Sequence, residues 1–463
     1  MSAPILYIVV PMAVALAAFF VRRKAGLALG ISLGLYLLLG LLAFFQEFGA
    51  VVKLGPISFD LGTSMAILGR AFVLSNADRY FLVISSVVVV LWLGGVRAAG
   101  LNAQIVPYIL LTAASLTAAI AVEPFLYSAV FMEMSVLFLM PVFITGNEPL
   151  RKGVLRFLIF QSLAMPLILL GGWFIAGNQA SPSDLQQLLI AAFFLGVGFA
   201  FWLAAFPFHS WVPQLAEEIH PYLYGFVLTL FPQAALLVVL DFTTSITWIR
   251  ESSFLSAIFL SVGVIMLVAA AVLGNIEKKV QRLFGDLILY ETGALLILIG
   301  LQTTSSLQAF YLSLTPRLLA IIIASLCISI IGVDKRAEKP AADGNFWHYP
   351  FASLGFLISL FSIVGLPPLG EFPYKLILIS SLGGVQQINN IWVIGGFIGM
   401  ALPLFRVMRR TFVPASSKIE VHEPLPQIVL ICIGIFLLLL MGTFPRVISS
   451  LFTNLLQFLP AGG

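Results

Sequence analysis

Apolar residues run through almost the whole chain in stretches of about twenty, separated by short polar segments. A stretch of this length can cross the hydrocarbon core of a bilayer as a helix. The pattern therefore predicts an all-α polytopic membrane protein with about fourteen spanning helices. The stretches lie near residues 4–21, 26–46, 79–98, 105–122, 124–144, 154–176, 186–206, 221–241, 254–274, 283–302, 316–333, 351–384, 390–408 and 426–444.

The stretch 351–384 is interrupted by the sequence GLPPLG at Gly365–Gly370. Pro367 and Pro368 each lack a backbone N–H, and their rings clash with the preceding helical turn. We therefore expect a discontinuous helix, with Lys375 just beyond the break. In a membrane, such a break is tolerated only where protein or a wet cavity satisfies the freed backbone groups.

A second apolar segment, 196–211, repeats this pattern. It is interrupted at Pro207, and His209 follows two residues later. Two proline-interrupted membrane segments in corresponding positions of two halves indicate a transport site built on internal repeats.

Charge is scarce and unevenly placed. About 60 % of residues are hydrophobic and 10 % are charged. Loops after odd-numbered spans hold 17 of the 24 lysines and arginines, and the other loops and the two tails hold 5. Since basic residues concentrate in cytoplasmic loops, both termini should face away from the cytoplasm. The basic balance follows from this topology, so we expect no nucleic-acid partner.

The first stretch has no basic region before it, so we interpret it as a span and not as a cleavable signal peptide. Residues 1–103 are predicted to form an N-terminal three-helix unit. The β-prone pieces Val51–Leu54 and Ile57–Asp60 flank Gly55–Pro56, which predicts a hairpin on the outer face.

The remaining loops are too short for a soluble domain. The sequence has no Gly-rich phosphate loop, and Cys327 and Cys432 fall in separate spans without metal-ligand spacing. We therefore predict no cofactor of its own, and any redox chemistry must come from a partner. After Gln104, the longer loops are predicted at Gly177–Asp184, His209–Pro221 and Val333–Trp347.

Charged side chains at membrane depth are costly, and most of them are functional. Glu133 is a single acid in an apolar helix, which suits a proton carrier. The structural alternative is a neutral acid hydrogen-bonded to a neighbouring helix. Lys375 is a candidate proton relay, and its alternative is a lysine that extends to the membrane interface.

Asp286 and Glu291 lie in one predicted helix but five residues apart, so they do not share a stripe. We expect at most one of them to face Lys375. Arg317 follows Pro316 at a predicted helix start, and it is either a buried counter-ion or an interfacial anchor.

His209 and His220 bracket a predicted loop that carries Glu217 and Glu218. A metal site and solvated loop histidines are both compatible with this pattern. The loop setting favours the histidines, and we predict no metal.

Several motifs together resemble the antiporter-like membrane subunits of respiratory complex I, Mrp-type cation/proton antiporters and membrane-bound hydrogenases. The sequence PFHSWVP is similar to their PFHxWLP motif. GLPP followed by FPYK is similar to GxPP…GFxxK, with Glu371 at the usual second glycine. The matching segments are Pro207–Pro213, Gly365–Lys375, Phe131–Glu133, Lys279–Gly293 and Gly442–Pro445.

The resemblance implies fourteen helices with two inverted five-helix repeats, each a proton half-channel with a broken helix. The first repeat would occupy residues 104–245, the second 246–412, and a C-terminal helix 413–463. It also implies a bacterial-type inner membrane, partner membrane subunits, and protons or sodium ions as the transported species.

The sequence departs from the family at the first half-channel. Trp202 stands where the family has a lysine, and Phe231–Ala234 lack the following lysine or histidine. In the eleventh span Arg317 replaces a lysine and Ser313 a histidine. Because arginine does not release its proton at accessible pH, Arg317 can tune a field but cannot relay.

Three functions follow as hypotheses. The first is a proton-translocating subunit of a complex I-like assembly, with Lys375, Glu133 and Glu291 as relays. Asp286, His209 and Glu371 would support them, as would Arg317. The second is a structural or docking subunit that has lost transport. The third is the membrane half of a non-redox, ion-coupled complex.

Overall fold

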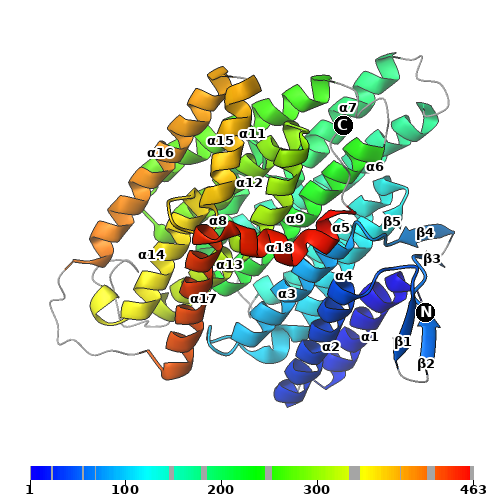
Figure 1. The fold of residues 1–463 in the computed structure, drawn as a ribbon, viewed down its shortest axis with the longest axis horizontal. Helices are drawn as coiled ribbons and strands as arrows, with labels where there is room; N and C mark the ends of the chain where they lie inside the picture. Colours follow the sequence, from blue (N-terminus) through cyan, green and yellow to red (C-terminus); the bar gives the residue numbers. More distant parts are fainter. Residues whose placement is uncertain are drawn as a thin grey trace.

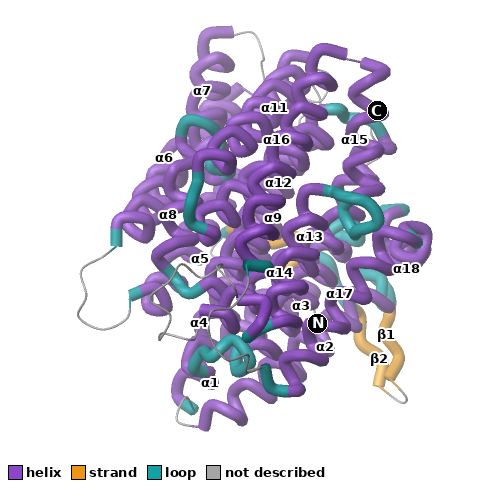
Figure 2. The backbone as a smooth tube through the Cα atoms, turned by 90° about the vertical axis from the view of Figure 1, so that its left-hand side faces the viewer, coloured by secondary structure: helices purple, strands orange, loops and turns teal. Residues whose placement is uncertain are grey.

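The computed structural model describes residues 2–21, 24–54, 57–67, 69–144, 151–178, 185–245, 253–332, 345–385, 387–413 and 423–458. These residues form a helical bundle from which a small hairpin projects (Figures 1 and 2). The helices are α1 (Val10–Phe20), α2 (Ala25–Phe45), α3 (Arg79–Gly95), α4 (Val106–Ala121), α5 (Ser128–Phe143), α6 (Lys152–Asn178), α7 (Leu185–Trp202), α8 (Trp211–Glu218), α9 (Pro221–Ser245), α11 (Ser253–Ile276), α12 (Val280–Gly300), α13 (Thr304–Gly332), α14 (Pro350–Val364), α15 (Phe372–Val385), α16 (Gln387–Thr411), α17 (Leu425–Thr443) and α18 (Pro445–Leu456).

Within the described part of the chain, 10 helices are long and apolar enough to cross a membrane. A multi-pass membrane protein is therefore confirmed, while the count of fourteen spans stays a prediction. The remaining apolar helices are shorter, and they are Ile5–Phe20, Arg79–Gly95, Leu189–Trp202 and Pro350–Val364.

Burial separates the centre of the bundle from its rim. In the most apolar part of each helix, 100 % of the residues of α9 and α12 are buried, and 89 % of those of α13. The corresponding shares are 28 % in α2 and 17 % in α17. Helices α9, α12 and α13 therefore form the centre, and the rim helices expose apolar side chains where lipid would lie.

Both predicted helix breaks are present. Helix α14 ends at Val364 and α15 begins at Phe372, while α7 ends at Trp202 and the chain resumes as a 3-10 turn at Phe208–Ser210. Gly365 closes α14 in the left-handed region with φ +89°, which favours glycine. Its N–H donates to the carbonyl oxygens of Phe361 and Ser362 at 3.2 and 3.0 Å.

The stretch His209–Pro221 corrects the sequence prediction of a loop. It contains helix α8, with Trp211, Val212 and Leu215 buried. Pro213 lies in the first turn of this helix, where its missing N–H costs no hydrogen bond. Pro213 therefore fits a helix start.

Helix α13 also corrects a prediction, because it begins at Thr304 and not near Pro316. Pro316 lies inside the helix, and neighbouring helices can compensate the hydrogen bond that such a proline removes. Arg317 is therefore in the middle of a buried helix.

The predicted hairpin is present as β1 (Val51–Leu54) paired antiparallel with β2 (Ile57–Asp60). The sequence did not reveal a second, three-stranded antiparallel sheet of β3 (Ser64–Ile67), β4 (Arg70–Val73) and β5 (Val122–Glu123). These strands are only two to four residues long, too short for a clear alternation.

Arg79 begins α3, and its side chain is buried. It donates hydrogen bonds to the carbonyl oxygens of Ala43 and Phe44 at 2.9 and 3.0 Å. These carbonyls belong to the last turn of α2, which has no intrahelical donors left to satisfy it. Arg79 thus caps α2.

Helix α18 follows α17 and lies across the bundle near α3 (Figure 1). Its Phe452 packs against Tyr80 and Phe44, with ring centroids 5.2 and 6.3 Å apart. The helix has 12 residues.

We expect the close contact of α11 with α12 to be sensitive to a single methyl group. A Cβ on Gly263 would lie 2.8 Å from the Gly293 carbonyl oxygen. Gly263→Ala should lower the free energy of unfolding by about 1–3 kcal/mol, as overpacking does. The matched control is Gly34→Ala, whose Cβ would meet nothing within 4 Å. Thermal unfolding in detergent measures both, and equal losses would contradict the packing argument.

Candidate functional site at the second helix break

Lys375 lies in the first turn of α15, immediately after the second break. Its Nζ forms an ion pair with Glu291 of α12 and lies 3.9 Å from a carboxylate oxygen of Glu371. All three side chains are buried, with Lys375 4 % exposed and the two acids 0 %. A buried charge without a partner is strongly destabilising, so these groups depend on one another.

The break itself holds this cluster in place. A Cβ on Gly365 would lie 2.5 Å from Lys375 Cγ, so the turn fits closely around the lysine stem. The Tyr290 hydroxyl donates a hydrogen bond to the Val364 carbonyl oxygen at 3.0 Å. This carbonyl lies at the C-terminal end of α14, where the helix itself supplies no donor. The Lys375 ammonium lies 5.5 Å from the centroid of the same tyrosine ring.

Tyr290 was missed by the sequence reasoning. The signal was its place beside Glu291, because residues next to a buried acid on a central helix are also in the interior. A tyrosine there can pair its hydroxyl and present a ring face to a cation.

Arg317 of α13 is 1 % exposed, so the alternative of an interfacial anchor is wrong. Its guanidinium donates to the carbonyl oxygens of Leu228 and Thr229 on α9, at 3.1 and 3.5 Å. Pro232 lies four residues after Leu228 and has no N–H to bond this carbonyl. Arg317 therefore supplies the donor that α9 lacks.

The same arginine acts electrostatically on the lysine cluster, because Glu291 and Glu371 are both within its electrostatic reach. The charges of two acidic and two basic side chains thus compensate one another in the interior. One carboxylate oxygen of Glu291 and the Arg317 Nε have no hydrogen-bond partner among the described residues. A proton or a water molecule could therefore bind within the cluster.

Asp286 is also buried on α12, and it lies more than one helical turn before Glu291. The neighbours that influence it are Glu277, Arg282 and Tyr224. The ion pairs of Lys375 involve Glu291 and Glu371, so Asp286 lies outside this cluster.

The first break differs from the second. Glu133 of α5 is half-buried, and it accepts a 2.6 Å hydrogen bond from the Ser162 hydroxyl of α6. It has no ion pair within the described residues. Trp202 is buried against Phe199, with ring centroids 5.8 Å apart. Ser162, which the sequence reasoning also missed, is thus the group that meets Glu133.

Gln233 occupies the segment where a lysine or histidine is absent. Its side chain is 1 % exposed, and its amide oxygen and nitrogen find no hydrogen-bond partner in the described part of the chain. The first half therefore keeps a polar interior group here, but not a charge.

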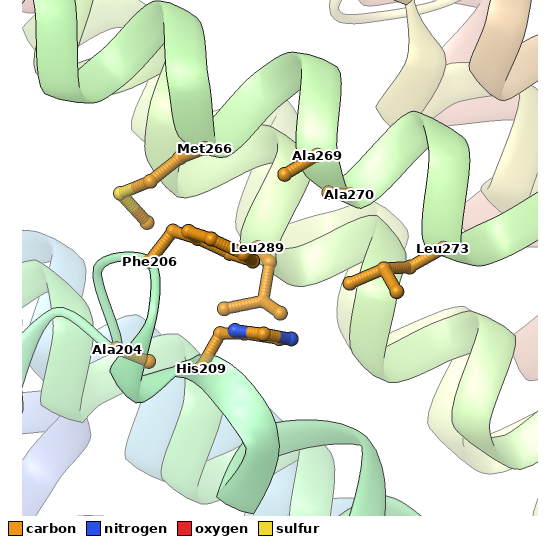
Figure 3. A pocket seen from close by; sticks show the side chains of 8 residues that line it. All are labelled: Ala204, Phe206, His209, Met266, Ala269, Ala270, Leu273 and Leu289. Carbon is orange, nitrogen blue, oxygen red and sulfur yellow. The ribbon is translucent and has the colours of Figure 1, made fainter.

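His209 lies in the 3-10 turn after the first break and is half-buried. Its ring stacks on Phe206, with centroids 4.9 Å apart and planes at 15°. Figure 3 shows the two rings beside a small hollow lined by Met266, Leu289 and neighbouring residues of α11. The solvated loop histidine that we expected is thus packed in apolar surroundings.

The acids beside it already have partners. Glu218 accepts hydrogen bonds from the N–H groups of Gly153 and Val154 at 2.6 and 3.2 Å, at the start of α6. Glu217 forms ion pairs with Lys279 and Arg282. No cluster of three metal-ligating side chains occurs among the residues described.

A bundle of apolar helices that buries charged groups at a helix break places this chain among the polytopic membrane proteins. Residues 100–401 match the family "NADH:quinone oxidoreductase/Mrp antiporter, TM". The chain belongs to this family.

Similar sequences include NADH-quinone oxidoreductase subunit N 2 of Acidobacterium capsulatum, 23 % identical over 339 residues covering 68 % of each chain. Subunit N of Cytophaga hutchinsonii is 23 % identical over 356 residues, 70 % of this chain and 76 % of that one.

Two solved assemblies contain chains of the same fold. A chain of the Mrp complex from Dietzia sp. DQ12-45-1b superposes with a TM-score of 0.81 at 16 % identity, covering 99 % of this chain and 97 % of that one. A chain of respiratory complex I from Thermus thermophilus superposes with a TM-score of 0.74 at 19 % identity, covering 98 % of both. The antiporter-like membrane fold is therefore established.

The contact of Arg317 with the proline-freed carbonyl yields a prediction. Arg317→Lys keeps the charge but loses the forked donor, so it should cost about 1–3 kcal/mol of unfolding free energy. Pro232→Ala restores a backbone N–H that can donate to the Leu228 carbonyl oxygen. Arg317→Lys should therefore cost less unfolding free energy in the Pro232→Ala variant than in the wild type. Thermal unfolding of the four variants measures this coupling, and additive losses would show that the proline plays no part.

Proposed function

We propose that this chain is a proton-translocating membrane subunit of a multi-subunit assembly related to complex I, with Lys375 as its central relay. The single observation that carries the proposal is the buried Lys375–Glu291 pair beside the α14–α15 break. A buried lysine and acid in contact can exchange a proton without leaving either charge isolated in the membrane. Sodium ion is the alternative transported species.

In this proposal each group has its own part. Lys375 Nζ holds the proton and passes it on, and Glu291 accepts it across the shared ion pair. Glu371 offers a second carboxylate when the lysine is charged. Arg317 keeps a fixed positive charge because its guanidinium does not deprotonate.

In this proposal the first half of the chain does not carry protons. Glu133 has a hydroxyl partner and no ion pair among the described residues, and Trp202 and Gln233 stand at positions where the family has basic residues. His209 and Asp286 would support the relay without carrying the central proton.

Partners and placement form part of the same proposal. The relatives are named as subunits of oxidoreductase complexes, and the neighbouring structures are Mrp and complex I assemblies. We infer other membrane subunits as partners, a bacterial-type inner membrane, and both termini on the non-cytoplasmic side. Two inverted repeats, 104–245 and 246–412, would follow the unit 1–103 and precede the C-terminal helix in 413–463.

A docking subunit without transport is the second candidate, and the loss of lysines at the first break favours it. The membrane half of a non-redox, ion-coupled complex is the third. Mass spectrometry of proteins that co-purify with the tagged chain in mild detergent separates the partners. Quinone-reductase or hydrogenase subunits support the first proposal, and one soluble non-redox partner supports the third.

Lys375→Ala should abolish ion translocation by the intact complex in proteoliposomes, measured with a pH-sensitive dye. Subunit composition on a native gel should stay unchanged. The matched control is Lys278→Ala, an exposed lysine, which should leave the rate as in the wild type. Full translocation in the Lys375 variant, together with failed assembly after deletion of the chain, would support the docking role instead.

Glu133→Gln tests the inactive first half. Because its carboxyl already accepts a neutral hydroxyl, the amide should preserve that hydrogen bond and translocation should change less than twofold, under about 0.4 kcal/mol of barrier. The same dye assay measures the rate. A loss as large as that of Lys375→Ala would show that both halves conduct.

A further inference from the structure

An apolar cavity of about 240 Å³ opens between α7 and α11, away from the charged cluster. Its lining residues come from α6, α7, α9, α11, α12 and the first break, and all are apolar or glycine. The cavity therefore lies where the first half of the chain meets the second.

The cavity has an exposed mouth and a buried floor. Phe254 and Ile258 at the mouth are 65 % and 37 % exposed, on the apolar rim of the bundle. Phe199, Phe242 and Leu296 on the floor are 7 %, 4 % and 2 % exposed. A ligand would thus enter from the side of the membrane and reach the interior.

Water is a poor occupant, because an apolar cavity gives it no hydrogen-bond partners and stays dry. An empty cavity of this size destabilises a fold in proportion to its volume. Helix α11 at the mouth is long and apolar enough to cross a membrane, so lipid hydrocarbon can reach the cavity there. Hydrocarbon matches the lining and needs no polar partner. We propose that one acyl chain of a bilayer phospholipid occupies this cavity.

This acyl-chain site touches the first helix break directly. Leu203, Ala205 and Phe206 line it, and they form the chain just before Pro207. Phe206 also stacks on His209, as Figure 3 shows. An inserted chain therefore supports the irregular backbone at the break from the lipid side. This proposal does not depend on ion translocation.

The test uses the purified protein with its co-purifying subunits, reconstituted in vesicles of phosphatidylcholine that carries a diazirine on the acyl chain. Illumination and peptide mass spectrometry then locate the labelled residues. The expected labels are on the walls formed by α7, α11 and α12, with the rim of α2 as an internal control for ordinary lipid contact.

Gly196→Phe places an aromatic ring in the site, because Gly196 lines the cavity and a Cβ there would meet nothing within 4 Å. Labelling of Phe199 and Leu296 should be lost in this variant, while labelling of α2 persists. The matched control is Gly34→Phe, where a Cβ also meets nothing within 4 Å. This control should leave the labelling of the cavity walls unchanged.

Two results would overturn the proposal. Absence of label on the cavity walls of the wild type, with normal label on α2, would show that lipid does not enter. Labelling of the walls in the isolated chain, but not in the assembled complex, would show that a partner helix covers the mouth. Thermal unfolding of Gly196→Phe close to that of the wild type confirms that loss of label reports the filled cavity.

Discussion

The cost of an uncompensated charge inside a membrane governs the organisation of this chain. Lys375, Glu291 and Glu371 are buried together, and none could remain charged there alone. The break between α14 and α15 makes the arrangement possible. It ends α14 at Val364, starts α15 at Phe372, and directs the lysine toward the central helix α12.

The same constraint applies to backbone groups. Pro232 leaves the Leu228 carbonyl of α9 without an intrahelical donor, and Arg317 supplies one from α13. Arg79 serves the last turn of α2 in a similar way. In both cases an arginine replaces a missing helix hydrogen bond, so its role is to join helices. Lys375 differs, because its partners are side chains that can themselves take up a proton.

The two breaks, the β1–β2 hairpin and the membrane character could be predicted, since prolines and long apolar runs leave local signals. The position of Arg317 could not, because Pro316 looked like a helix start and tertiary contacts carry the helix through it. Helix α8 was hidden for a related reason, as its proline lies where a helix can begin. The contacts of Tyr290 and Ser162 depend on which helices are neighbours, and no local pattern encodes that.

Infrared difference spectroscopy of the reconstituted complex during an imposed pH jump tests the central claim most directly, because a carboxyl stretch reports its own protonation. A protonated-carboxyl band should appear in the wild type and disappear in Glu291→Gln. Lys375→Met should alter this band, while Asp286→Asn should leave it in place. A carboxyl band that is identical in wild type and Glu291→Gln would contradict proton exchange at the Lys375–Glu291 pair.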